Sequence, residues 1–255
     1  MLKKKNLKLI LWTFFILLYS FAQFAIEGIA KETVSLTTDD GKKLKCTYFP
    51  PPTPKAPGVI LLPDTGCNRS KFGSVPKALN KAGFAVLAMD FRYKSIIGSK
   101  NRKEAIRTII QQDLVALAKY DAKSGIDFLS SKNEIDSGRI ALIGTSLGSR
   151  IALISGVEHN LNALVLISLS GEKILPDYKP IKQFLSDYGE KPILFMTAKK
   201  DWGGNKKAAE HNKLYYKFKT GAKELKIWIG SGHGIDILKT KESTEFVATW
   251  LKSNL

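Results

Sequence analysis

The chain has 255 residues, of which 44% are hydrophobic and 25% charged, with 20 Gly and 10 Pro. This composition indicates a globular protein and excludes disorder, collagen and coiled coil as the main state. Only two cysteines, Cys46 and Cys67, are present, which excludes a disulfide scaffold and a four-thiolate zinc site. Three histidines leave little room for a His-rich metal centre. We therefore expect no metal and no other cofactor.

The formal net charge of +17 comes mainly from lysine, because only six of the 40 basic residues are arginine. The lysines are spread along the whole chain, whereas nucleic-acid readers concentrate Arg and aromatic residues on one element. We expect a positively charged surface with no nucleic-acid partner and at most weak attraction to anionic envelope surfaces. The oligomeric state stays open.

The N-terminus has the pattern of a secretory signal. Lysines in residues 1–8 precede Leu9–Ile26, which is 18 residues long and carries no charge. Cleavage after Gly28-Ile29-Ala30 would leave a mature domain of residues 31–255 outside the cytoplasm, secreted or periplasmic. The alternative is an uncleaved membrane anchor through residues 9–26, which just reach the length of a membrane span.

From residue 31 onward, the first elements in chain order are strands. Residues 32–38 and 43–49 alternate around Asp39-Asp40-Gly41, which predicts a hairpin. Later runs are almost wholly apolar, as in strands covered on both faces. These runs cover residues 58–62, 85–89, 139–143, 163–168, 192–196 and 225–229.

Helical stretches alternate with these runs. They cover residues 74–82, 104–131, 148–157, 181–187, 208–220 and 242–254. Strands that alternate with helices imply βαβ crossovers. The sequence therefore predicts an α/β fold with a mostly parallel, doubly wound sheet led by an antiparallel hairpin.

A nucleophile elbow follows the run at 139–143. Gly144-Thr145-Ser146-Leu147-Gly148 is a G-x-S-x-G sequence between a predicted strand and a predicted helix. A sharp turn there would expose Ser146 Oγ above the sheet, and the Leu147 N–H at the helix start would favour a developing oxyanion.

A serine hydroxyl needs a base, and His233 lies in a Gly-rich loop just past the run at 225–229. Asp201 follows the run at 192–196 and could hold the imidazole in the required tautomer. We predict a Ser146–Asp201–His233 triad. His159 and His211 are interpreted as surface residues.

These residues resemble the α/β-hydrolase family over nearly all of Lys31–Leu255, closest to its dienelactone-hydrolase-like or small serine esterase branch. The resemblance is carried by GTSLGS around Ser146, AKKD ending at Asp201, SGHG around His233, and Asp90-Phe91-Arg92. It implies a hydrolase fold and a second oxyanion donor at the backbone N–H of Thr65.

Two features depart from the family pattern. Dienelactone hydrolases use a Cys nucleophile, so lactone specificity is not carried over to Ser146. Many relatives carry His-Gly where this chain has Pro63-Asp64, and a carboxylate there would repel an oxyanion. We predict that Asp64 pairs with Arg92 or turns away to cap the segment that follows it.

The connection between residues 171 and 191 has room for one helix, so we expect no cap domain and an open substrate groove. Trp202, Phe91 and Tyr93 are candidate groove walls. An open groove suits a small-molecule ester or an ester borne on a polymer.

The leading hypothesis is a serine esterase that works through an acyl-enzyme. A peptidase or a thioesterase could use the same triad. From a different class, a catalytically silent fold could serve as a cell-envelope binding module.

Overall fold

The structure, a computed structural model, describes residues 31–93, 114–172 and 179–255. The predicted signal or anchor at residues 1–30 lies outside the described residues. Lys31–Leu255 forms one compact unit. In the described part of the chain, no helix is both long and apolar enough to cross a membrane.

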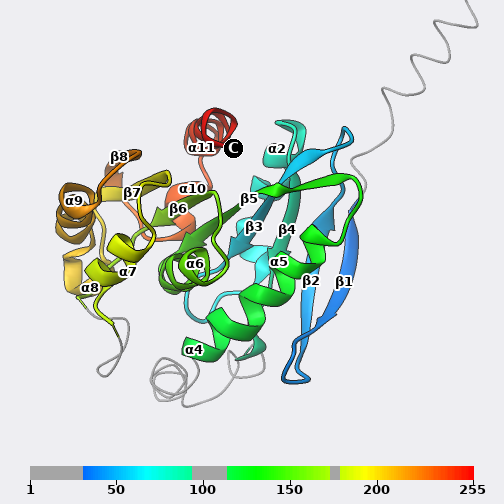
Figure 1. Cartoon of the computed structure of the whole chain (residues 1–255). Coiled ribbons are helices and arrows are strands. Elements are labelled where there is room, and N and C mark those ends of the chain that lie inside the picture. The colour runs from blue at the N-terminus through cyan, green and yellow to red at the C-terminus, as the bar shows by residue number, and fades with distance from the viewer. Residues whose placement is uncertain (1–30, 94–113, 173–178) are drawn as a thin grey trace, which may run out of the picture. The chain divides into compact units, whose positions relative to one another are not determined.

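Within the described residues, eight strands form one sheet, and each predicted strand is found (Figure 1). They are β1 (Glu32–Thr37), β2 (Lys43–Phe49), β3 (Ala56–Leu62), β4 (Ala85–Met89), β5 (Ile135–Thr145), β6 (Ala163–Ile167), β7 (Ile193–Lys200) and β8 (Lys223–Ser231). Their order across the sheet is β1-β2-β4-β3-β5-β6-β7-β8. The β1–β2 and β2–β4 pairs are antiparallel, and the remaining pairs are parallel.

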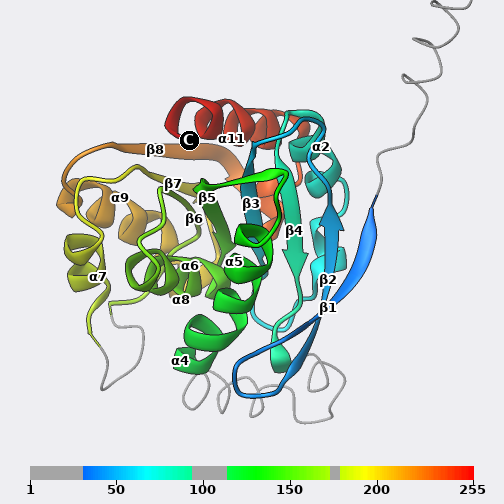
Figure 2. The ribbon, with the colours of Figure 1, turned by 45° about the vertical axis from the view of Figure 1, so that its right-hand side comes forward.

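Helices cover both faces of the sheet, which explains the apolar strands. The helical elements are η1 (Arg69–Phe72), α2 (Val75–Lys81), α4 (Leu114–Ala116), η3 (Leu117–Ala122), α5 (Lys123–Ser130), α6 (Leu147–Glu158), α7 (Ile181–Asp187), α8 (Gly203–Lys206), α9 (Ala208–Phe218), α10 (Ile235–Leu238) and α11 (Lys241–Asn254). In Figure 2, α2 and α11 lie on one face, and α5 and α6 on the other. Every residue of β4 and β6 is buried between these layers.

The predicted long helix at 104–131 is described only from Leu114 onward. That part is a continuous helical run, but η3 within it is a π-helix, which the sequence pattern does not show. Between β6 and β7, the described residues contain one helix, α7, and no cap domain is evident. The prediction of an uncapped α/β-hydrolase architecture is confirmed.

Parallel strands end at a common edge of the sheet, and this edge positions the site. Asp64, Ser146, Ser168, Asp201 and His233 all follow the carboxyl ends of parallel strands, namely β3, β5, β6, β7 and β8. Residues far apart in the chain are thereby brought together.

Candidate active site

The turn at Ser146 has the conformation expected of a nucleophile elbow. β5 ends at Thr145, α6 begins at Leu147, and Ser146 between them has φ 51° and ψ −109°. A positive φ is unfavourable for a residue with a Cβ, and it is retained when the surrounding structure fixes it. Here the Ser146 N–H donates to the Ile167 carbonyl at 2.9 Å, and the Ser149 hydroxyl donates to the Ser146 carbonyl at 2.5 Å.

The glycines on either side of the elbow allow close backbone packing. A Cβ at Gly148 would overlap the Leu62 carbonyl group at the end of β3, and a Cβ at Gly144 would overlap the backbone of Gly148. The first turn of α6 can therefore lie directly against β3 because position 148 lacks a side chain, and against the end of β5 because position 144 lacks one.

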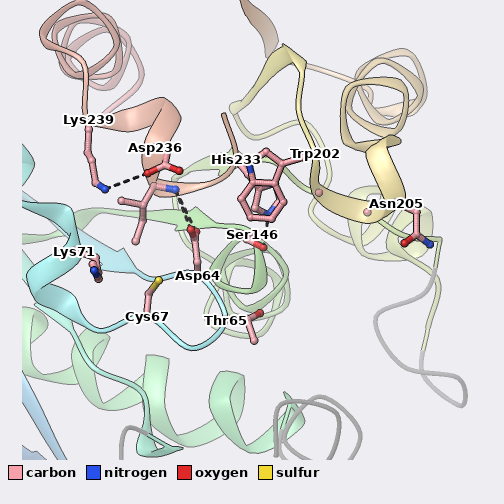
Figure 3. Close-up of a pocket in the computed structure, with 13 residues that line it drawn as sticks. Asp64, Thr65, Cys67, Lys71, Ser146, Trp202, Asn205, His233, Asp236 and Lys239 are labelled. Atoms are coloured by element: carbon pink, nitrogen blue, oxygen red, sulfur yellow. Dashed lines mark hydrogen bonds and ion pairs between the residues drawn. The ribbon is translucent and has the colours of Figure 1, made fainter. Parts of the chain in front are cut away.

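The structure brings the three residues of the predicted triad into one hydrogen-bonded chain. His233 Nε2 lies 2.7 Å from Ser146 Oγ (Figure 3). His233 Nδ1 lies 2.6 Å from Asp201 Oδ1. His233 and Asp201 are buried. A base within hydrogen-bond reach of a hydroxyl, oriented by a carboxylate, is the arrangement that activates a serine nucleophile.

The Asp201 carboxylate accepts hydrogen bonds on both of its oxygens. Oδ1 accepts from the Gly203 N–H at 2.9 Å as well as from His233, and Oδ2 accepts from Ser168 Oγ at 2.6 Å and Thr197 Oγ1 at 3.0 Å. Burial alone would raise the pKa of Asp201, but hydrogen bonds from His233, Ser168 and the Gly203 N–H outweigh it and lower the pKa. The carboxylate is therefore held ionised beside the imidazole.

Trp202 and Gly203, directly after Asp201, enclose the imidazole. The ring centroids of Trp202 and His233 are 4.4 Å apart, with the planes tilted by 43°. A Cβ at Gly203 would overlap the His233 ring, so this position has no room for a side chain. The imidazole therefore packs closely against both the Trp202 ring and the backbone of Gly203.

A cavity of about 620 Å³ opens beside Ser146 (Figure 3). Ser146, His233, Thr65 and Trp202 line it, and Trp202 is 59% exposed. The other lining residues are Asp64, Cys67, Lys71, Gly203, Gly204, Asn205, Ile235, Asp236 and Lys239. Thr65, the expected second oxyanion donor, thus lies in the same cavity as Ser146, and Leu147 begins the helix beside it. Within the described residues, no group of three His, Cys, Asp or Glu side chains could hold a metal ion.

Comparison with a family sequence profile and with solved structures identifies the family of this chain. The profile of the Dienelactone hydrolase family matches residues 44–246. The chain belongs to this family. A dienelactone hydrolase from Anabaena variabilis superposes on this family member with a TM-score of 0.66 at 18% identity, covering 89% of this chain and 98% of that one. The Pyrococcus furiosus esterase Pf2001 gives a TM-score of 0.62 at 19% identity, covering 88% of this chain and 90% of that one.

Among curated proteins, this dienelactone hydrolase family member resembles two uncharacterized proteins of Mycobacterium tuberculosis, from strains CDC 1551 / Oshkosh and ATCC 25618 / H37Rv. Each is 31% identical over 140 residues, which are 54% of this chain and 46% of the relative. The chain spans about half the length of these relatives.

The predicted pair of Asp64 with Arg92 is wrong. The Arg92 guanidinium binds Asp40 at 2.6 Å and Asp121 at 2.6 Å, and these two carboxylates satisfy its charge and its fork of N–H donors. Asp64 instead accepts the Ile235 N–H at the start of α10, at 3.2 Å from each carboxylate oxygen. The second predicted option, in which Asp64 turns away to cap a backbone segment, is closer to the structure. The N–H that Asp64 binds is at the start of α10, however, and not in the segment that follows Asp64. Burial raises the pKa of Asp64, although Thr145 and the Ile235 N–H oppose this shift.

Two of the three predicted groove residues do not line the cavity of this family member. Phe91 and Tyr93 are 2% and 3% exposed and belong to the hydrophobic core, with their ring centroids 5.7 Å apart. Removal of both rings from water in this core is favourable, and it leaves neither side chain at the cavity wall. Only Trp202 has the predicted location.

The two histidines that the sequence assigned to the surface are half-buried. His159 follows the last residue of α6, and His211 on α9 accepts the Gly171 N–H at 3.2 Å. Neither lines the cavity. His233 is the histidine that contacts Ser146.

Sequence reasoning missed Ser168 and Thr197, which both donate to Asp201. Ser168 directly follows β6, the strand beside the elbow strand β5, and Thr197 lies near the end of β7, the next strand along. A small hydroxyl residue at the end of an apolar strand is the signal that could have found them. Small hydroxyl residues end many strands, so this signal selects candidates without identifying their partners.

Proposed function

We propose that this member of the dienelactone hydrolase family is a serine hydrolase that cleaves carboxylic ester bonds through an acyl-enzyme on Ser146. The observation that carries the proposal is the continuous hydrogen-bonded chain from Ser146 Oγ through the His233 imidazole to Asp201. The strained backbone at Ser146 supports the same assignment, because such strain is retained mainly at functional positions.

In the proposed reaction, Ser146 Oγ attacks the ester carbonyl carbon while His233 Nε2 accepts the hydroxyl proton. The tetrahedral oxyanion receives hydrogen bonds from the N–H groups of Leu147 and Thr65. His233 then gives its proton to the departing alkoxide, which leaves the acyl group on Ser146. A water molecule, deprotonated by His233, hydrolyses the acyl-enzyme and restores the serine.

The cavity beside Ser146 leaves room for an ester whose alcohol part is of variable size. Trp202 offers an exposed apolar face, while Lys71 and Lys239 add charge to the opposite wall in Figure 3. We propose a small-molecule ester or an ester borne on a polymer as the substrate. Because the chain has a formal net charge of +17, we include weak attraction to anionic envelope surfaces in the same proposal.

Labelling with a fluorophosphonate tests the proposal, because this probe phosphorylates an activated serine. Mass spectrometry should place one adduct on Ser146, and Ser146→Ala should remove it and reduce ester hydrolysis on the order of 10⁴-fold. Absence of labelling in a folded wild-type protein would favour a catalytically silent binding module. A screen of p-nitrophenyl esters, lactones, acetylated sugars, thioesters and peptide amides then identifies the bond that is cleaved.

We further propose that the domain acts outside the cytoplasm after removal of residues 1–30. The support is the basic segment followed by the uncharged stretch Leu9–Ile26. N-terminal sequencing of the exported protein should begin near Lys31. Recovery of the intact Met1 segment in the membrane fraction would establish an anchor instead.

A further inference from the structure

Ser168 connects the two segments that carry the acid and the base. It follows β6 directly, is fully buried, and has φ 57°, which an L-residue rarely adopts. Its hydroxyl donates to Asp201 Oδ2 at 2.6 Å and accepts the backbone N–H of Gly234 at 2.8 Å. Gly234 is the residue after His233.

The two roles of this hydroxyl are fixed by chemistry. An ionised carboxylate only accepts hydrogen bonds, and a backbone N–H only donates. The single hydroxyl proton must therefore point to Asp201, and an oxygen lone pair must face Gly234. The arrangement ties the base-bearing loop to the ionised acid.

The neighbouring contacts show what is special to Ser168. Thr197 donates to the same oxygen of Asp201, but its other hydrogen bond goes to the Ala198 carbonyl and not to the loop at 233–235. On the other side, the Ile235 N–H is shared between both oxygens of Asp64 at 3.2 Å each. The 2.8 Å bond to Ser168 is the shorter of the two anchors on this loop.

We propose that Ser168 is a positioning residue whose hydroxyl clamps the His233 loop to Asp201. The clamp keeps Nδ1 on Asp201 Oδ1 while Nε2 remains within reach of Ser146 Oγ. Small displacements of reacting groups reduce rates strongly, so the anchor contributes to turnover without touching the substrate. This inference rests on the proposed hydrolase function for its kinetic consequences, but the clamp itself is a property of the folded chain.

The test compares Ser168→Ala with Thr197→Val as its matched control. Both variants remove one hydroxyl donor from Asp201 Oδ2, and only the first also leaves the Gly234 N–H without its acceptor. Ser168→Gly is a second variant, which removes the same hydroxyl while tolerating the positive φ. It keeps the test usable if the alanine variant folds poorly.

Hydrogen exchange of a peptide covering residues 232–236 measures the clamp without any turnover. We expect exchange in Ser168→Ala and Ser168→Gly to be roughly tenfold or more faster than in wild type, with Thr197→Val unchanged. Equal exchange in all four proteins would overturn the clamp. Because this measurement needs no substrate, its result is independent of whether the protein proves to be an esterase.

Kinetics then separate positioning from simple tuning of the Asp201 charge. We expect kcat to fall roughly 10–100-fold in Ser168→Ala at nearly constant KM, and to stay within about fivefold in Thr197→Val. Identical kcat losses in the two variants would show that Ser168 only adjusts the charge of Asp201.

Discussion

Asp121 and Asp201 are both buried carboxylates with several hydrogen-bond donors, but the donors differ in charge. Asp121 binds the permanently charged Arg92, which Asp40 also binds. Asp201 accepts from a hydroxyl pair, a backbone N–H and the His233 imidazole. Burial raises the pKa of Asp121 despite its bonds to Arg92, whereas the pKa of Asp201 is lowered by its donors.

This difference separates a structural acid from a candidate catalytic one. The charge of Asp121 is neutralised by a cation that cannot give up its proton. The donors around Asp201 include no permanent cation, so its negative charge is not neutralised. The carboxylate can therefore stabilise the imidazole when that ring gains a proton at Nε2. Asp121 therefore helps to hold the β1–β2 hairpin through Arg92, whereas Asp201 orients the His233 imidazole.

The largest expected effect is on Asp201. Asp201→Asn should reduce kcat for ester hydrolysis on the order of 10⁴-fold, because an amide favours the wrong imidazole tautomer. Initial rates with a p-nitrophenyl ester measure this loss. Asp236→Asn is a matched control, since Asp236 is an exposed acid that lines the same cavity. A rate within tenfold of wild type would show that Asp201 does not orient the base.

Asp121 should show the reverse behaviour. The Arg92 side chain is 11% exposed and binds both Asp40 and Asp121. Asp121→Ala removes one of these two acid partners and leaves Asp40. We expect the free energy of unfolding to fall by about 3 kcal/mol, at the lower end for a broken buried pair. Urea titration measures this change. Activity per folded molecule should stay near wild type, and a loss comparable to that of Asp201→Asn would remove the distinction between the two acids.

The packing around the imidazole gives a third test. Gly203→Ala places a Cβ where the His233 ring lies, so we expect kcat to fall roughly 100-fold through displacement of the ring. Gly232→Ala is the control from the same loop as His233, because its nearest neighbour, the Ile237 side chain, would be at 3.5 Å. If both variants keep full activity, the imidazole is not confined by the segment after Asp201.

The hairpin network has a pH signature. Hydrogen bonds from Arg92 and Thr38 lower the pKa of Asp40 to about 2. A depressed acid pKa contributes stability that is present above the unfolded value of about 4 and is lost as the pH falls through about 2. The effect should be under about 1 kcal/mol, since the Asp40 side chain is 29% exposed. Urea titrations at pH 7, 4 and 2.5 should show a smaller decline for Asp40→Asn than for wild type.

The smallest effect concerns Asp64 and Arg92. Because Arg92 binds Asp40 and Asp121 while Asp64 binds the Ile235 N–H, Arg92→Ala and Asp64→Asn should act independently on kcat. A double-mutant cycle should give an interaction energy below about 0.5 kcal/mol. A larger coupling would mean that the two side chains communicate despite their separate partners.

The sequence predicted the architecture well because apolar runs and helical periodicity depend on local composition. The strand at residues 85–89 and the helix at residues 181–187 have the predicted bounds. The elements that were not predicted, η1, α8 and α10, have only four residues each, too few for periodicity to be visible. The meeting of Ser146, Asp201 and His233 was also predictable, since parallel strands end at one edge.

The errors arose where a choice between partners depends on three-dimensional distance. Arg92 lies 52 residues from Asp40 and 29 from Asp121, and nothing in the spacing ranks these acids above Asp64. Phe91 and Tyr93 follow a strand just as Trp202 does, but their side chains enter the core. The direction of a side chain after a strand end depends on the loop path, which residue type alone does not specify.

The backbone of Ser146 has a consequence for the evolution of the chain. Glycine adopts φ 51° without a steric penalty, whereas the strained conformation of serine there costs on the order of 1–3 kcal/mol. A lineage or laboratory selection that rewards stability alone would therefore favour Ser146→Gly and lose the hydroxyl. Stabilised variants obtained by screening for folding should be sequenced at position 146, because a gain in stability there would remove the proposed nucleophile.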